Sequence, residues 1–267
     1  MPTVRDVNEY LFSIAPIEMK ADFDNVGLLV GRGDASTAKI LVSLDITNDV
    51  IAEALEIGAN LIVSHHPMFF SLKSVTDADT TGGRIIRMLS EGIAAICMHT
   101  NLDVARGGVN DELAVAAGIA TDGERSSLLS EDGRLPSGEV FSYGRYGYLE
   151  KPCSMPEYLA FLKTSLNANG LRYHDAGRIV HKVAIASGSG GDNFEHTIKQ
   201  GCDTFITADI KYHIFLEAKE MNINLIDAEH FCTENVVTGV LAKKLCAAFP
   251  DTEVTVSNIH TQTARYH

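Results

Sequence analysis

Residues 61–67 of the chain read LIVSHHP. The three branched aliphatic residues at the start of this stretch favour a short buried strand, because such side chains pack well on a pleated sheet. The proline removes a backbone donor and ends the strand. The two histidines therefore stand at the carboxyl end of the strand, where the chain leaves the sheet.

The same arrangement occurs twice more in the chain. Residues 96–103 read ICMHTNLD, and residues 225–234 read LIDAEHFCTE. In an open α/β sheet, ligands bind outside the carboxyl ends of the strands. The three stretches predict that one set of metal-ligand residue types collects at such edges, namely His65, His66, His99, Asp103, His230 and Glu234.

Strand and helix patterns alternate along the rest of the chain, which predicts an α/β fold with mainly parallel strands. Helices are expected over Thr3–Ala15, Asn48–Ile57, Gly82–Glu91, Gly108–Ala117 and Tyr212–Met221, from Ser154 onward, and as one long helix from Glu229 or His230 to about Ala248. Strands are expected over Lys39–Leu44, Asn60–Ser64, Ile93–Met98, Phe141–Leu149, Val180–Ala186, Thr204–Thr207, Asn224–Ile226 and Glu253–Val256.

Two of the expected helices carry an additional start signal. Thr3 with Asp6, and Ser154 with Glu157, have the spacing of a capping box. Between the two series of elements lies an irregular stretch, Thr121–Gly138, which is the best internal boundary. We therefore expect one α/β domain from residues 1–125 plus about 230–267, with a second α/β domain, residues 126–229, inserted into it.

The composition excludes several classes of protein. The chain has 267 residues, a net charge of −13 and no Lys/Arg-rich run, which argues against nucleic-acid binding. It has neither the roughly 18 consecutive apolar residues of a membrane span nor a secretory signal, so a cytoplasmic location is the default expectation. The five cysteines are widely spaced without a C-x-x-C pair, which argues against a disulfide framework or a thiolate zinc site. Cys97 and Cys202 lie in or beside apolar segments and are expected to be buried.

The spacing of the six residues predicts more than one metal ion. His230 and Glu234 are four positions apart at a helix start and share one face, and His99 and Asp103 have the same spacing. A single histidine at a strand end is usually only a hydrogen-bonded polar residue, but three such groups favour metal binding. Four imidazoles and two carboxylates exceed one tetrahedral site, so we predict two divalent ions a few ångströms apart. The donor set suits zinc, iron, manganese, cobalt or nickel.

For several other polar residues the sequence allows more than one role. The turn Ser187–Gly191 follows a strand and precedes a helix, so it is either a phosphate-binding loop or a plain tight turn. Asp45 and the Asp24-Asn25 pair are candidates for supporting or substrate-binding roles, although the pair is equally typical of a turn. His213 could line the cavity or orient a ligand. His260 and His267, near the end of the chain, are expected to be solvated.

Taken in order, several motifs give the chain a family resemblance. The motifs are Asp24-Asn25-Val26-Gly27-Leu28, Ser64-His65-His66-Pro67, His99-Thr100-Asn101-Leu102-Asp103, Gly107-Gly108-Val109-Asn110, Asp209-Ile210-Lys211-Tyr212-His213 and His230-Phe231-x-Thr233-Glu234. With them the chain resembles the Nif-three-like dinuclear-metal family, also called GTP cyclohydrolase I type 2. The resemblance implies two interlinked α/β domains of similar topology and a toroidal homohexamer with metal sites facing an internal cavity. It implies that His65, His66, Asp103, His230 and Glu234 are metal ligands, with His99 a ligand or a close neighbour.

Two functional hypotheses follow. The first is a metal-dependent hydrolase acting on a nucleotide or another small anionic substrate, in the extreme case a GTP cyclohydrolase that opens the imidazole ring of the purine. Glu229, Asp227 or His213 could then move protons. The second hypothesis is a non-enzymatic metal-binding scaffold or regulatory interaction protein with the same ligands and no open coordination position.

Overall fold

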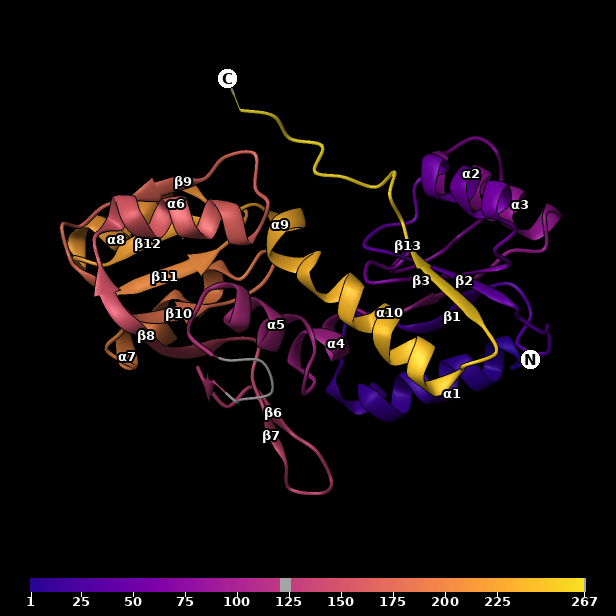
Figure 1. Ribbon diagram of the computed structural model, residues 1–267, viewed down its shortest axis with the longest axis horizontal. Helices are drawn as coiled ribbons and strands as arrows, with labels where there is room; N and C mark the ends of the chain where they lie inside the picture. The colour runs from indigo at the N-terminus through magenta and orange to yellow at the C-terminus, as the bar shows by residue number, and fades with distance from the viewer. Residues whose placement is uncertain (121–125, 267) are drawn as a thin grey trace. The chain divides into compact units, whose positions relative to one another are not determined.

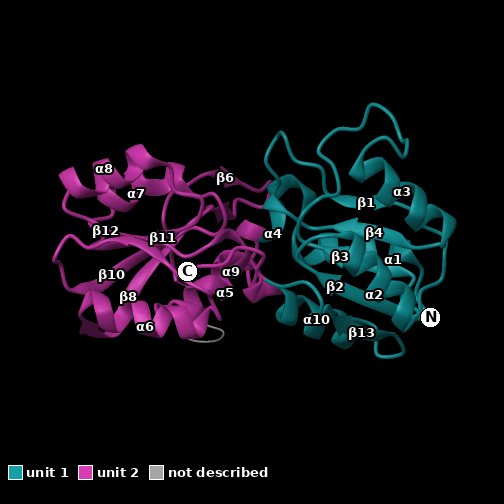
Figure 2. Ribbon diagram, turned by 90° about the horizontal axis from the view of Figure 1, so that it is seen from above, with its two compact units in different colours: residues 1–102, 238–261 teal, residues 103–237, 262–267 magenta. Residues whose placement is uncertain are grey.

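The computed structural model describes residues 1–120 and 126–266. The prediction for His267, and the first part of the predicted boundary stretch Thr121–Gly138, lie outside the described residues. Contacts between residues group the chain into two compact units, shown in Figure 2. Unit 1 holds residues 1–102 and 238–261, and unit 2 holds residues 103–237 and 262–267. The domain boundaries expected at residues 125 and 230 stay a prediction.

Unit 1 is built on a five-stranded sheet (Figure 1). Its strands lie in the order β1 (Gly27–Val30), β4 (Ala94–Cys97), β3 (Leu61–Ser64), β2 (Lys39–Ser43) and β13 (Glu253–Val256). Strands β4, β3, β2 and β13 are parallel, and β1 pairs with β4 in the antiparallel sense. The carboxyl ends of the four parallel strands therefore meet at one edge of the sheet, as the sequence pattern predicts.

Helices cover both faces of this sheet. On one face, α2 (Asn48–Ile57) and α3 (Thr80–Ser90) pack on the sheet through a buried apolar core that includes Leu41, Ile62 and Ala95. On the opposite face lie α1 (Val4–Ile14), followed by the short helix η1 (Ile17–Met19), and α10 (Val236–Ala248) (Figure 1). The capping box at Thr3 and Asp6 is confirmed, because each residue's side chain bonds the other's backbone N–H.

Unit 2 contains a six-stranded sheet with the order β5 (Ser127–Leu128), β8 (Arg145–Cys153), β10 (Val180–Ile185), β11 (Thr204–Thr207), β12 (Asn224–Asp227) and β9 (Arg172–His174). The three central strands β10, β11 and β12 are parallel, and their outer neighbours are antiparallel to them. A separate two-stranded ribbon joins β6 (Gly133–Arg134) and β7 (Val140–Phe141).

The strands of unit 2 bury both faces because successive side chains point to opposite sides. Ile206 and Ile226 pack into one core with α5 (Val109–Ala116) and α6 (Met155–Ser165). Their neighbours Phe205 and Leu225 pack into a second core with α7 (Phe194–Lys199) and α8 (Tyr212–Glu220). Three short helices remain among the described residues. Helix η2 (Gly191–Asn193) precedes α7, and α9 (His230–Glu234) precedes α10. Helix α4 (Thr100–Val104) spans the boundary in the chain between unit 1 and unit 2.

Two expectations about secondary structure are wrong. The long helix predicted from residue 229 or 230 is two helices, since α9 ends at Glu234 and α10 begins at Val236. The strand predicted over Phe141–Leu149 is divided into β7 and β8, because the chain bends at Tyr143 between them. No strand was expected over residues 27–30, which form β1, because pairing with β4 outweighs a weak local preference. No helix in the described residues is both long and apolar enough to cross a bilayer.

Candidate metal centre

Three of the predicted ligands come together in unit 1. His65 and His66 follow β3, and His99 follows the adjacent parallel strand β4. Their ring centroids lie 5.0 Å (His65–His66), 5.2 Å (His65–His99) and 5.5 Å (His66–His99) apart. One ring nitrogen of each lies within 4.8 Å of one ring nitrogen of each of the others, so this histidine cluster could hold a metal ion.

Each ring of the histidine cluster has its Nδ1 atom next to a protein acceptor. His65 Nδ1 lies 2.9 Å from the carbonyl oxygen of Met98. His66 Nδ1 lies 2.8 Å from Asp45 Oδ1, and His99 Nδ1 lies 2.8 Å from Asp24 Oδ1. A carbonyl or an ionised carboxylate only accepts hydrogen bonds, so the proton of each neutral ring is on Nδ1. That tautomer leaves the Nε2 lone pair available for a metal, the usual arrangement of a metal-binding histidine.

Asp24 and Asp45 are ionised supports for these rings. Burial by itself raises the pKa of the Asp24 carboxyl, but hydrogen bonds from His99 and Thr100 outweigh burial and lower it. Burial also opposes ionisation of Asp45, whose pKa is nevertheless lowered by hydrogen bonds from His260 and His66. Both side chains are therefore carboxylates at neutral pH. Of the supporting and substrate-binding roles considered for them, their contacts with the histidine rings favour the supporting one.

The other three predicted ligands come together in unit 2. His230 and Glu234 lie at the two ends of α9, with His230 Nε2 3.0 Å from Glu234 Oε2. An oxygen of Asp103, on α4, lies within 4.8 Å of an oxygen of Glu234. The Nδ1 atom of His230 is 2.7 Å from Asp209 Oδ2. This His–carboxylate cluster (Asp103, His230 and Glu234) thus repeats the arrangement of unit 1, with the remaining imidazole nitrogen beside a candidate ligand.

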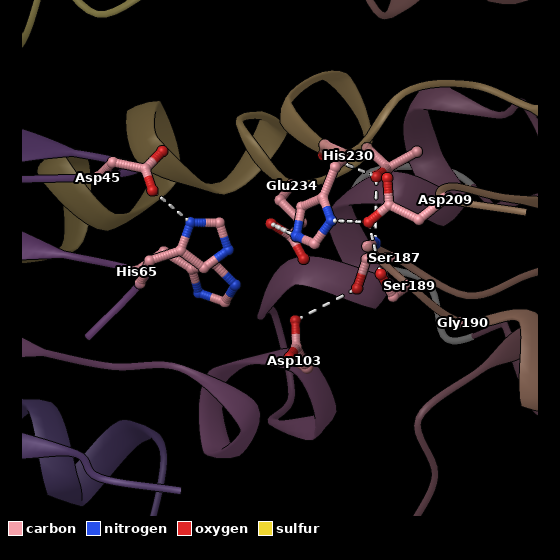
Figure 3. A network of polar contacts seen from close by, with 12 residues as sticks. Asp45, His65, Asp103, Ser187, Ser189, Gly190, Asp209, His230 and Glu234 are labelled. Carbon is pink, nitrogen blue, oxygen red and sulfur yellow. Dashed lines mark hydrogen bonds and ion pairs between the residues drawn. The ribbon is translucent and has the colours of Figure 1, made fainter. Parts of the chain in front are cut away.

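The turn after β10 holds the His–carboxylate cluster in place (Figure 3). The Ser187 hydroxyl donates to Asp103 at 3.2 Å, and the Ser189 hydroxyl donates to Asp209 at 2.5 Å. Gly188 allows the close approach: a Cβ atom at this position would stand 2.2 Å from Glu234 Oε1, and its φ of +55° also favours glycine. The turn is therefore a support for the predicted ligands.

Backbone groups of the same turn are used within the protein. The N–H of Ser187 donates to Asn110, that of Gly188 to Thr233 and that of Gly190 to Thr207. A phosphate-binding loop needs such groups for its anion. Of the two interpretations of Ser187–Gly191, the geometry therefore favours the tight turn.

Several residues outside the predicted set support the candidate site. Asp209 lies two residues after β11 with a φ of +52°, and the motif that begins with it pointed to it without giving its role. His213, from the same motif, is exposed on α8. The expectation of a solvated His260 is wrong: its side chain is 12% exposed and its Nε2 atom lies 2.7 Å from Asp45 Oδ2.

The cysteines are not part of the site's donor set as far as the structure describes them. Cys97, Cys202 and Cys232 are buried, which confirms the expectation for the first two. Cys232 lies between His230 and Glu234 in sequence, but its thiol packs in the apolar core with α5 and α6, and burial raises its pKa to about 11. A neutral thiol facing the core is a poor metal ligand.

Comparison with known proteins decides the family. A profile of the family described as Duf34/NIF3 (NGG1p interacting factor 3) matches residues 2–264. The chain belongs to the DUF34/NIF3 family. This confirms the resemblance seen in the sequence motifs.

Relatives in the DUF34/NIF3 family match over most of their length. A "GTP cyclohydrolase 1 type 2 homolog" of Clostridium acetobutylicum is 39% identical over 244 residues, which is 91% of this chain and 89% of the relative. The Streptomyces coelicolor protein of the same name is 33% identical over 239 residues, 88% of this chain and 82% of the relative.

Solved structures of DUF34/NIF3 proteins share the fold. A Staphylococcus aureus protein has a TM-score of 0.90 and 28% identity, with 100% of both chains covered. A Bacillus cereus protein related to NIF3 has a TM-score of 0.92 over 100% of this chain and 99% of its own, at 21% identity. The mixed α/β architecture with mainly parallel central strands is therefore that of the family.

Proposed function

We propose that this protein binds two divalent metal ions per subunit and uses them in hydrolysis. The ligands would be the histidine cluster of unit 1 and the His–carboxylate cluster of unit 2. Zinc, iron, manganese, cobalt and nickel all suit imidazole and carboxylate donors, and the buried thiol of Cys232 adds no preference for softer ions.

One observation carries this proposal: all four histidines have Nδ1 next to an acceptor. Three of the acceptors are carboxylates, Asp45, Asp24 and Asp209, and the fourth is the carbonyl of Met98. A histidine that only packs in the core needs no particular tautomer. A histidine that binds a metal through Nε2 needs that nitrogen deprotonated and the ring held in a fixed orientation. Finding the same arrangement at four histidines from three separate stretches of the sequence supports a donor set built for metal.

The residues fit divalent ions by charge as well as by atom type. Asp103 and Glu234 bring two buried carboxyl groups within 4.8 Å of each other, an arrangement that is costly unless a proton or a cation lies between the oxygens. When bound, two such ions supply a Lewis acid and water that ionises near neutral pH. The chain itself orients the ligands through Asp24, Asp45 and Asp209.

The proposed substrate class is a nucleotide or a similar small anion. The support is the name of the relatives, "GTP cyclohydrolase 1 type 2 homolog", together with the cationic character that metal ions would give to a site in a protein of net charge −13. GTP is the first substrate to test, with opening of the purine imidazole ring as the reaction.

The candidates for proton transfer differ in how their side chains are engaged. Asp227 accepts hydrogen bonds from the guanidinium of Arg172 and the N–H of Ile210, a role that joins β9 and the loop after β11 to β12. Glu229 accepts from the hydroxyl of Tyr266 and is only partly buried. Of the two, we propose Glu229 for proton transfer, because Asp227 is buried and engaged by two donors.

Metal content tests the first half of the proposal. Purified protein is loaded with each candidate ion, dialysed, and analysed for metal per subunit by elemental mass spectrometry. We expect about two ions for the wild type and fewer for His66→Ala and Glu234→Ala. The matched control is His196→Ala on α7, which should bind as the wild type does. Equal binding by all four proteins would contradict the proposed ligands.

Turnover tests the second half. GTP consumption by the metal-loaded wild type is compared with that of His66→Ala, and a panel of other nucleotides and phosphate esters follows. Loss of activity in the variant supports hydrolysis at these residues. Metal binding without turnover of any compound would instead favour the alternative, a metal-binding scaffold or regulatory interaction protein.

We also propose that the protein assembles as a homohexamer, on the strength of its family membership alone. Light scattering coupled to size exclusion should give a mass about six times the 28.9 kDa of the subunit. The mass of a monomer, dimer or trimer would reject this assembly.

A further inference from the structure

His260 and His66 share one carboxylate in unit 1. His66 Nδ1 lies 2.8 Å from Asp45 Oδ1, and His260 Nε2 lies 2.7 Å from Asp45 Oδ2. Each oxygen of Asp45 therefore faces a different imidazole. The two histidines are almost two hundred positions apart in the sequence, and the side chains of both are mostly buried, with 20% and 12% exposure for His66 and His260.

The segment that carries His260 is held against the sheet. After β13, the N–H of Ser257 donates to the carbonyl of Val42 on β2. The Ser257 hydroxyl and the N–H of Asn258 both donate to the buried carboxylate of Glu53 on α2, and the N–H of His260 donates to the Ser257 hydroxyl. His260 is thus placed by contacts with two elements of unit 1 and is not a loosely attached residue of a chain end.

Asp45 follows β2 and is partly buried. The last torsion of an aspartate side chain is broad, so a carboxylate bonded at one oxygen only can rotate or turn toward water. A donor on the second oxygen fixes the plane of the group and keeps the first oxygen aimed at its partner. Asp45 has such a donor on each oxygen, His66 on Oδ1 and His260 on Oδ2.

We propose that His260 is a positioning residue for His66: it fixes the Asp45 carboxylate, which in turn fixes the tautomer and orientation of the His66 ring. The inference rests on the proposed function, because it treats His66 as a metal ligand. It adds a residue from outside the family motifs quoted above and from a segment of the chain far from the others. His260 itself presents its Nε2 atom to Asp45 and is not proposed as a ligand.

The test compares two substitutions of His260 by amide side chains that differ in length. In His260→Gln the amide nitrogen stands near the position of Nε2 and can still donate to Asp45, whereas in His260→Asn it is too short to do so. Affinity for zinc is measured by competition with a chromophoric chelator. We expect His260→Asn to bind the more weakly held ion about tenfold less tightly, at the low end of the range for groups outside the coordination sphere, and His260→Gln to stay near wild type.

Two controls separate positioning from general damage. His196→Asn makes the same change on α7 and should leave the affinity unchanged. In the background of Asp45→Ala, adding His260→Asn should cause no further loss, because His260 is proposed to act only through Asp45. Additive losses in the double variant would overturn the proposal.

A second readout needs no metal. Nitrogen-15 chemical shifts of the His66 ring in chelator-treated protein report which nitrogen carries the proton. We expect the Nδ1–H form in the wild type and in His260→Gln, and a larger Nε2–H population in His260→Asn. Unchanged shifts and unchanged zinc affinity in His260→Asn would overturn the inference while leaving the proposed function intact. If the wild type binds no metal the proposed function fails, and the ring shifts alone decide whether His260 positions His66.

Discussion

The Nδ1 atom of His230 lies 2.7 Å from the carboxylate of Asp209, a contact that joins the start of α9 to the loop after β11 within unit 2. Asp209 adopts a φ of +52°, a conformation that costs most residues about 1–2 kcal/mol and is least unfavourable for Gly, Asn and Asp. Ser189 donates a hydrogen bond to the same carboxylate. A residue that keeps an unfavourable backbone conformation while its side chain contacts a candidate ligand is typical of a functional position.

Asp209→Gly should therefore weaken metal binding without straining the backbone. Glycine accepts the positive φ but removes the carboxylate that fixes His230, so we expect a loss in zinc affinity of about 10- to 100-fold. Asp209→Asn keeps an oxygen that can accept a hydrogen bond from His230 Nδ1, so it should lose less zinc affinity than Asp209→Gly. Chelator competition measures both, with exposed Asp192→Asn as the control. Equal affinities of wild type and Asp209→Gly would show that Asp209 does not support the site.

Gly188→Ala should disturb Glu234 directly. The added methyl group would stand 2.2 Å from Glu234 Oε1 and 3.2 Å from His230 Nε2. Gly177→Ala is the matched control, since Gly177 also has a positive φ, +73°, but no described atom lies within 4 Å of the added Cβ. Both variants should lose about 1 kcal/mol of stability to backbone strain, and only Gly188→Ala should also lose metal affinity. Thermal unfolding and metal content distinguish the two effects.

Asp24→Asn should make the metal-free protein less stable at neutral pH. The Asp24 carboxylate accepts hydrogen bonds from His99 and from both the N–H and the hydroxyl of Thr100, and its folded-state pKa is lowered below the usual 3.8. A carboxyl whose pKa is lowered by folding stabilises the folded state at pH values above its unfolded-state pKa. This stabilisation is lost as the pH falls through the folded-state pKa. We expect the free energy of unfolding of Asp24→Asn to be about 1–3 kcal/mol lower than that of the wild type at pH 7.

The pH dependence gives that prediction a second check. The stability gap between wild type and Asp24→Asn should begin to shrink below about pH 5, because protons start to bind the unfolded-state carboxyl there. Urea unfolding in the presence of a chelator, at several values between pH 7 and pH 3, measures the gap. A gap that stays constant over this range would mean that the charge of Asp24 is not the cause.

Thiol reactivity should separate Cys232 from Cys246. Burial raises the pKa of Cys232 and of Cys202 to about 11, so at pH 8 only about one thiol in a thousand is ionised at either position, whereas Cys246 is exposed. Alkylation followed by peptide mass spectrometry should label Cys246 in the folded protein and Cys202 and Cys232 only after unfolding. Rapid labelling of Cys232 in the native state would contradict its place in the core.

Much of the architecture can be predicted from local sequence. The apolar runs before His65 and His99 form parallel strands, and both capping boxes form, because these features depend on residues a few positions apart. Pairing between distant segments was harder to foresee. Strand β1 exists because Gly27 and Leu28 pair with β4, and the break between α9 and α10 at Asn235 has no glycine or proline to mark it.

For the candidate site, the candidate ligands can be named from the sequence, since imidazole and carboxylate side chains bind metals and a parallel sheet presents such groups at its strand ends. The tertiary structure alone decided how those side chains are held. Asp24, Asp45, Asp209 and His260 reach their partners from positions 21 to 215 residues away, and hydrogen bonds over such separations depend on how the strands are ordered in space. For that reason His260, an unremarkable residue near the end of the chain, lies against the support of a predicted ligand.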